Sequence, residues 1–187
     1  DKDVIAKQPT IVVIYIGIND VWHGEKDPAR GTMPDKFESG LDEVIGKCKA
    51  AGARVILCTP TVIGELKDGK NNLDAQLDQY AEISRGVAKK LNLQLCDLRK
   101  AFVDHIQANN ADNKDKGILT TDGVHLNLAG NQFVAKHMLE ALGASSMKPN
   151  SIVFQLWRSV ARRERPVMAT AAAATASWAS SRLETAS

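Results

Sequence analysis

The sequence predicts a three-layer α/β/α fold, in which a parallel β-sheet carries helices on both faces. Short apolar runs rich in Val and Ile, such as IVVIYI at 11–16, are typical of strands buried on both faces. These runs alternate with segments of helical apolar periodicity, which indicates right-handed crossovers between parallel strands. A chain of 187 residues with 44% hydrophobic content suits one well-buried domain.

The first half of the chain predicts two strands and one helix. The strand at 11–16 is closed by Gly17, and we expect a loop over residues 21–32. A helix is expected from Pro34, a favourable first-turn residue, to Gly52, a residue that suits a helix end. Its apolar stripe has helical spacing and consists of Phe37, Leu41, Val44, Ile45 and Cys48. The second strand, 54–59, stops at Pro60 and opens a polar loop that reaches Asn72.

The second half predicts one further strand and three helices. An amphipathic helix is expected over 73–91 and a short strand over 93–97. The next helix is indicated by three apolar residues at helical spacing, Leu98, Phe102 and Ile106. Residues 109–116 (NNADNKDK) predict a polar loop without a core residue, and the last helix is expected at 128–142, closed by Gly143.

Composition excludes several classes of function. Residues 1–147 hold 18 basic and 20 acidic residues, so this part has no basic footprint for nucleic acid. No apolar run approaches the ~20 residues of a transmembrane helix. Cys48, Cys58 and Cys96 lack metal-ligand spacing, and we interpret them as small buried apolar residues.

The last forty residues differ in kind from the rest. Residues 148–187 hold 6 basic and 2 acidic residues, and 169–181 consist almost entirely of Ala, Ser and Thr. We therefore expect a domain at 1–147 and a disordered or weakly helical tail at 148–187. A basic amphipathic helix at 151–165 that touches a membrane surface or a partner is the alternative.

Two polar stretches are candidates for a site. Gly17-Ile18-Asn19-Asp20 follows the first strand at its carboxyl end, the edge where ligands bind in open α/β sheets. The same residue types also make ordinary turns, so this stretch alone is explained equally well by a turn. Asp122-Gly123-Val124-His125 places an acid and an imidazole three residues apart. The carboxylate can then accept from one ring nitrogen and leave the other free.

Together the two stretches resemble the SGNH hydrolase superfamily, also called GDSL-type esterases and lipases. Gly17, Asn19 and Asp20 match its third sequence block, and Asp122-Gly123-Val124-His125 matches its Asp-His stretch, within a resemblance that covers roughly residues 8–143. Thr59-Pro60 at the end of the second strand is also usual there. The resemblance implies a flavodoxin-like parallel sheet and hydrolysis of carboxylic esters, such as acetylated carbohydrates or lipid esters, without metal or cofactor.

The resemblance also implies a role for each matching residue. His125 would act as general base and then general acid, with Asp122 as its orienting partner. The Asn19 side-chain amide would donate to the oxyanion, and Gly17 would allow a close backbone approach. Asp20 is expected to fix the loop rather than to take part in the chemistry. Three residues are candidates for lining the pocket: Asp20, Trp22 and His23.

One departure from the superfamily is serious. The nucleophilic serine belongs to a Gly-Asp-Ser block after the superfamily's first strand, and no serine of this sequence has that context. The block with the second oxyanion glycine is missing as well. We expect that the first strands are lost from the front of the chain, so that 11–16 becomes an edge strand with the composition of an interior one. The chain alone is then expected to be insoluble or inactive on esters.

Two alternatives stay open at this point. A metal-dependent phosphoesterase would use Asp20, Asp122 and His125 as ligands, but needs further ligands at other strand ends. A non-catalytic α/β binding module would explain the missing serine without any truncation.

Overall fold

The centre of the fold is a parallel sheet of three strands in the order β1-β2-β3. The computed structural model describes residues 1–144, and the expected tail at 148–187 lies outside the described residues. The strands are β1 (Ile11–Tyr15), β2 (Arg54–Cys58) and β3 (Gln94–Cys96). Val13 pairs with Ile56, and Cys58 pairs with Cys96. The parallel arrangement is therefore confirmed, with β3 shorter than expected.

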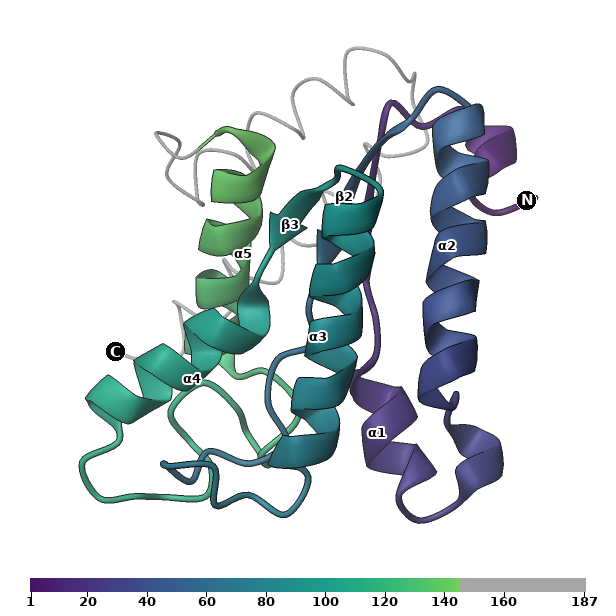
Figure 1. Ribbon diagram of the computed structural model, residues 1–187. Helices are drawn as coiled ribbons and strands as arrows, with labels where there is room; N and C mark the ends of the chain where they lie inside the picture. The colour runs from purple at the N-terminus through teal and green to yellow at the C-terminus, as the bar shows by residue number, and fades with distance from the viewer. Residues whose placement is uncertain (145–187) are drawn as a thin grey trace, which may run out of the picture. The chain divides into compact units, whose positions relative to one another are not determined.

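Four long helices cover the two faces of the sheet. They are α2 (Pro34–Ala50), α3 (Asp74–Lys90), α4 (Leu98–Asn109) and α5 (Leu128–Leu142). Alternate side chains of β2 enter two separate cores: Val55 and Leu57 join residues of α2 and α3, whereas Ile56 and Cys58 join residues of α4 and α5. Figure 1 shows α2 and α3 side by side, with α5 beside β3. The three-layer α/β/α prediction is confirmed.

The start of α5 is fixed against the loop that precedes it. The Asn127 side chain accepts a hydrogen bond from Gly130 N at 2.9 Å, which caps the helix. A Cβ atom at Gly130 would lie 2.0 Å from Leu119 O, so only glycine allows this approach of helix and loop. Gly143 ends the helix with a φ of 82°, as expected.

One expectation about the loops is wrong. Residues 21–32, expected as a loop, contain most of helix α1 (Ile18–Gly24) and the 3-10 turn η2 (Pro28–Arg30); a second such turn, η1 (Ile5–Lys7), precedes β1. Seven residues are too few to show an apolar stripe, and α1 is held instead by burial of Val21. Residues 110–116 form a loop that adds no residue to either core, as expected; the Asn110 side chain is nevertheless buried, and its amide donates to the Glu65 and Lys114 carbonyls at 2.7 Å each.

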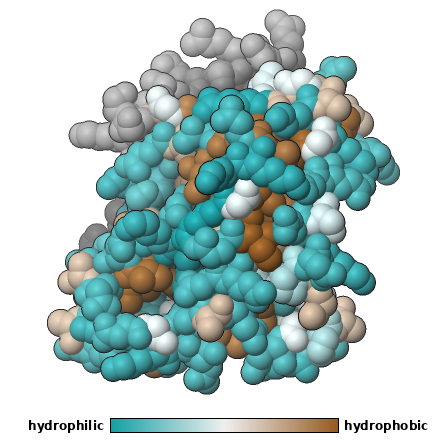
Figure 2. Space-filling view, viewed as in Figure 1, coloured by the Kyte–Doolittle hydropathy of each residue, from teal (hydrophilic) through white to brown (hydrophobic). Residues whose placement is uncertain are grey.

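The face of the molecule drawn in Figure 2 is mostly polar. Hydrophilic side chains cover most of the face in Figure 2, and apolar ones show only in small patches. None of the helices within residues 1–144 has the length and apolar character that a membrane span requires. The three cysteines are buried and unbridged, as their positions in the predicted elements indicate.

Candidate active site

The polar ends of the three strands meet at one edge of the sheet. Gly17 lies just beyond β1, Thr59 follows β2, and Asp97 follows β3. Parallel pairing in register brings these positions to the same side. Loop 60–72 continues from Thr59 at this edge, and backbone hydrogen bonds join it to loop 110–127, among them Gly64 N to Gly123 O at 2.7 Å and Glu65 N to Asp115 O at 2.9 Å.

Asp122 and His125 form a hydrogen-bonded pair in the second loop. Asp122 Oδ2 lies 2.7 Å from His125 Nδ1. The other carboxylate oxygen accepts from Val124 N at 3.0 Å and from His125 N at 2.8 Å. These backbone contacts close a tight turn that holds acid and imidazole face to face. Both side chains are largely open to solvent.

The carboxylate also determines which ring nitrogen carries the proton. The hydrogen bond from the His125 side chain, followed by those from the two backbone amides, holds the pKa of Asp122 well below its usual range. An ionised carboxylate can only accept, so His125 Nδ1 must donate and the neutral ring keeps Nε2 as a free acceptor. A ring oriented in this way can take a proton at Nε2 while the carboxylate stabilises the resulting imidazolium.

Helix α1 contributes an aromatic wall to this pair. The Trp22 and His125 ring centroids are 5.3 Å apart in an edge-to-face arrangement at 81°. Trp22 also packs on His23, with ring centroids 4.6 Å apart. The structure therefore brings Trp22 into contact with the His125 ring, and places His23 behind Trp22.

Asn19 and Gly17 lie at the start of the same helix. Asn19 is solvent-exposed in the first turn of α1, and its side chain makes no hydrogen bond within residues 1–144. Gly17 has a φ of 112°, and a Cβ atom there would lie 3.2 Å from the Phe37 ring. The conformation of Gly17 allows β1 to turn directly into α1. The exposed side-chain amide of Asn19 is available to donate a hydrogen bond to a ligand.

Asp20 and Trp22 border different hollows. Asp20 Oδ1 accepts from Thr32 N at 3.1 Å, a contact that ties α1 to the loop beyond it. It lines a hollow of about 340 Å³ between α1, η2 and α3, whereas Trp22 and Asp122 line a second one of similar volume. Within residues 1–144 no group of three or more His, Cys, Asp or Glu side chains is placed to hold a metal ion. The metal-dependent alternative gains no support from this arrangement.

Comparison with known proteins gives the family of the chain. Residues 1–133 match the model of the GDSL-like lipase/acylhydrolase family. The chain belongs to this family. The assignment confirms the resemblance inferred from the Gly17–Asp20 and Asp122–His125 stretches, and it agrees with the three-layer α/β/α fold described above.

Several relatives of this GDSL-like family member are esterases by name. An acetylxylan esterase of Geobacillus stearothermophilus is 29% identical over 147 residues, which cover 76% of this chain and 64% of that protein. A rat protein named isoamyl acetate-hydrolyzing esterase 1 homolog is 26% identical over 149 residues, covering 73% of this chain and 57% of the relative. The chain thus spans less than two thirds of either relative.

Solved structures give the same fold. The crystal structure of an acetyl xylan esterase, AlAXEase, superposes with a TM-score of 0.73 at 46% identity, over 75% of this chain and 70% of that one. The acetylxylan esterase Axe2 of Geobacillus stearothermophilus superposes with a TM-score of 0.66 at 28% identity, over 76% and 63% of the two chains.

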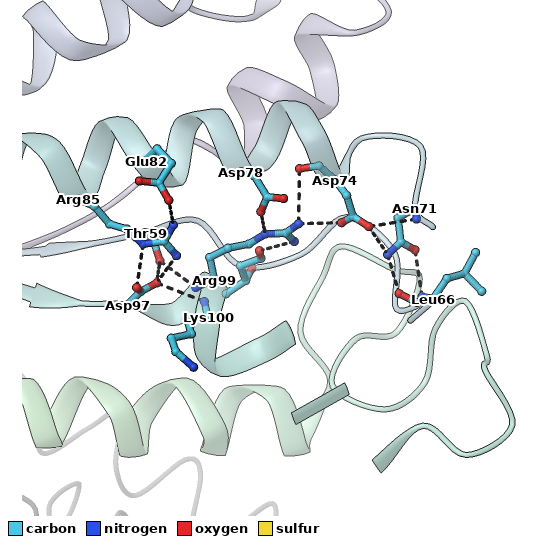
Figure 3. Close-up of polar contacts among 11 residues, drawn as sticks. Thr59, Leu66, Asn71, Asp74, Asp78, Glu82, Arg85, Asp97, Arg99 and Lys100 are labelled. Carbon is cyan, nitrogen blue, oxygen red and sulfur yellow. Dashed lines mark hydrogen bonds and ion pairs between the residues drawn. The ribbon is translucent and has the colours of Figure 1, made fainter. Parts of the chain in front are cut away.

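The GDSL-like domain supports its site with a buried polar network that the sequence did not reveal (Figure 3). Arg99, buried at the start of α4, pairs with Asp74 at 2.8 Å and with Asp78 at 2.6 Å. The second Asp74 oxygen accepts from Asn71 Nδ2 at 2.9 Å, and Asn71 in turn holds Leu66 at both its backbone N and O.

This network gives loop 60–72 a fixed conformation without regular secondary structure. One signal for it was present in the sequence, because Asp74 shares the buried face of its helix with Leu77 and Ala81. A carboxylate on an apolar stripe needs a buried partner. The identity of that partner, Arg99, depends on how α3 and α4 pack and could not be deduced from spacing.

Proposed function

We propose that this chain carries the acid–base part of an ester hydrolase, in which Asp122 and His125 serve a nucleophilic serine. The observation that supports the proposal is the 2.7 Å contact between Asp122 Oδ2 and His125 Nδ1, which leaves Nε2 without a hydrogen-bond partner within residues 1–144, beside the carboxyl ends of the strands. The serine itself would lie in a Gly-Asp-Ser block, which the 187 residues do not contain.

The proposed reaction has two stages. In the first, the serine Oγ attacks the ester carbonyl carbon while His125 Nε2 takes the hydroxyl proton. The carbonyl oxygen becomes an oxyanion, to which the Asn19 side-chain amide donates a hydrogen bond. Collapse of the tetrahedral intermediate expels the alcohol, which receives the proton from Nε2. Water then repeats the sequence on the acyl-enzyme and releases the carboxylic acid.

Acetyl esters are the proposed substrate class. Acetate is the acyl group in the names of both kinds of relative, acetylxylan esterase and isoamyl acetate-hydrolyzing esterase. The hollow beside Asp122 is lined by Trp22, by polar side chains such as Lys70 and Asn72, and by the apolar side chains of Ile63, Leu66, Leu73 and Val124; His125 and Asn19 lie outside its lining. The Trp22 face together with the hydrogen-bonding side chains of Lys70 and Asn72 would accommodate the sugar of an acetylated carbohydrate.

The test uses p-nitrophenyl acetate as substrate and a longer protein. In the longer protein, a segment before Asp1 supplies the Gly-Asp-Ser block and the block with the second oxyanion glycine. We expect His125→Ala to lower kcat by about 10⁶-fold, because the serine loses its base. His105→Ala is the matched control, since His105 packs on Phe133 of α5 away from the pair, and it should keep full activity. The 187-residue chain alone is expected to be inactive.

Three results would contradict the proposal. Turnover by the 187-residue chain at a rate comparable to the longer form would show that no additional serine is needed. Full activity of the His125→Ala variant would remove the base from the mechanism. Binding of an acetylated sugar without any hydrolysis by the longer form would favour the non-catalytic module instead.

A further inference from the structure

Glu65 is a fully buried acid in loop 60–72 that the mechanism does not use. Its side chain has 0% exposure and accepts four hydrogen bonds. Oε1 accepts from Leu119 N at 2.7 Å, Thr120 N at 2.7 Å and Thr120 Oγ1 at 2.9 Å. Oε2 accepts from Ile118 N at 2.6 Å. One carboxylate therefore binds three consecutive residues that lie more than fifty positions away in the sequence.

The three residues held by Glu65 lead directly into the Asp122–His125 turn. Thr120 Oγ1, which donates to Glu65, also accepts from Gly123 N at 3.1 Å. Gly64 N donates to Gly123 O at 2.7 Å, so the residue beside Glu65 holds the middle of the turn. On the far side, Thr121 N donates to His125 O at 2.8 Å. The position of the turn is thus determined by residues 64 and 65 and by the segment that Glu65 binds.

Packing alone does not account for an acid at this place. Burying a carboxylate is costly, and an apolar side chain of similar volume would fill the space without that cost. The segment 118–120 lies outside the named helices and strands, however, so its buried N–H groups need acceptors from elsewhere. A carboxylate supplies several acceptor sites in a fixed geometry, which orients the backbone on which Asp122 and His125 are mounted.

We propose that Glu65 is the positioning residue of the Asp122–His125 pair, acting through Thr120 and the backbone of residues 118–120 without touching the substrate. The importance of Glu65 for catalysis rests on the function proposed above. Its effect on the orientation of the Asp122–His125 pair does not, because that orientation can be measured in a chain that turns over no ester.

The experiment compares Glu65→Gln with Glu43→Gln in the full chain. Glutamine keeps the volume of Glu65 but turns an NH₂ group toward one of the backbone donors. Glu43 is the matched control because it also has a side-chain partner, Lys47 at 2.8 Å, but lies exposed on α2. NMR of histidine-labelled and aspartate-labelled protein reports the His125 Nδ1–H proton and the titration of Asp122.

In Glu65→Gln we expect the low-field Nδ1–H signal of His125 to be lost and the pKa of Asp122 to rise toward the ordinary value of ~3.9. Glu43→Gln should leave both readouts unchanged. A folded Glu65→Gln variant that keeps the wild-type Nδ1–H signal and Asp122 titration would overturn the proposal.

A second variant covers the case in which Glu65→Gln does not fold. Thr120→Val removes only the hydroxyl that links Glu65 to Gly123 N, and Thr120→Ser restores it. We expect Thr120→Val to change the His125 and Asp122 signals and Thr120→Ser to return them to wild type. Unfolding of both Glu65→Gln and Thr120→Val would assign Glu65 to stability alone and reject the positioning role. The His125 and Asp122 signals can be measured even if the longer protein does not hydrolyse esters. The proposed function and the positioning role of Glu65 can therefore be rejected independently.

Discussion

Asp122 shows how much of a site one side chain can organise. Its two oxygens take three hydrogen bonds, two of them from the backbone of the turn that it starts and one from the imidazole that it orients. These contacts favour the charged carboxylate and lower its pKa, with the His125 side chain as the largest cause.

The low pKa of Asp122 predicts a specific pH response. A carboxyl group whose pKa is lower in the folded chain than in the unfolded chain stabilises the fold above the unfolded value of ~3.9, and this contribution is lost as pH falls toward the folded pKa. We expect the Asp122 carboxyl carbon, followed by NMR, to stay ionised at pH values where a free aspartate is protonated. His125→Ala should raise its pKa part of the way, because the two backbone bonds remain.

The control for this titration is His105→Ala, which removes an imidazole that has no contact with the pair and should leave the Asp122 curve unchanged. Titration of Asp122 at the ordinary value in the unmodified chain would mean that the contact with His125 does not persist in solution.

At the scale of elements, α3 and α4 are joined by a buried ion pair that also supports loop 60–72 (Figure 3). Asp74 and Arg99 have side-chain exposures of 9% and 4%, whereas Asp78, the second partner of Arg99, is 58% exposed. The two acids thus share one cation in very different surroundings, which makes them a natural comparison.

We predict that Asp74→Ala lowers the free energy of unfolding by about 3–5 kcal/mol, since it leaves a buried guanidinium without its main partner. It also removes the acceptor for Asn71, so the loop loses its support. Asp78→Ala should cost only about 0–1 kcal/mol, because its ion pair is largely screened by solvent. Urea unfolding followed by circular dichroism measures both variants, and equal losses would show that burial does not decide the strength of these contacts.

For the described part of the molecule as a whole, the feature with the widest consequence is the open edge of the sheet. Within residues 1–144, β1 has a strand neighbour on one side only. Ile11, Val13 and Ile16 are 42%, 39% and 49% exposed, and an apolar groove of about 460 Å³ runs between β1, η1 and α2. Unpaired N–H and C=O groups beside apolar side chains are a template for pairing with another chain.

We therefore predict that the chain self-associates through β1 and that Val13→Lys weakens this association. A lysine on the edge places a charge where two strands would meet. Val103→Lys is the matched control, because Val103 has a similar exposure of 44% but lies on α4. Sedimentation velocity over a range of concentrations measures the effect. A monomeric wild-type chain, or equal behaviour of the two variants, would contradict the prediction.

Most of the secondary structure and the local Asp122–His125 pair could be predicted from the sequence. Val- and Ile-rich runs, apolar stripes at helical spacing and end residues such as Gly143 depend on short-range chemistry, and they predicted the three strands and four long helices. Asp122 and His125 are three residues apart, so their contact is also local.

The contacts between groups far apart in the sequence follow from tertiary packing and could not be predicted. Trp22 reaches His125 from a helix too short to be recognised by periodicity, and Arg99 meets Asp74 across the packing of α3 on α4. Glu65 binds residues 118–120 through a loop that has no periodic pattern. Each contact depends on how helices pack or on where a long loop runs. The spacing of residues in the sequence specifies neither. The family match places these contacts in a member of the GDSL-like lipase/acylhydrolase family, and the contacts themselves explain how its Asp-His turn is held.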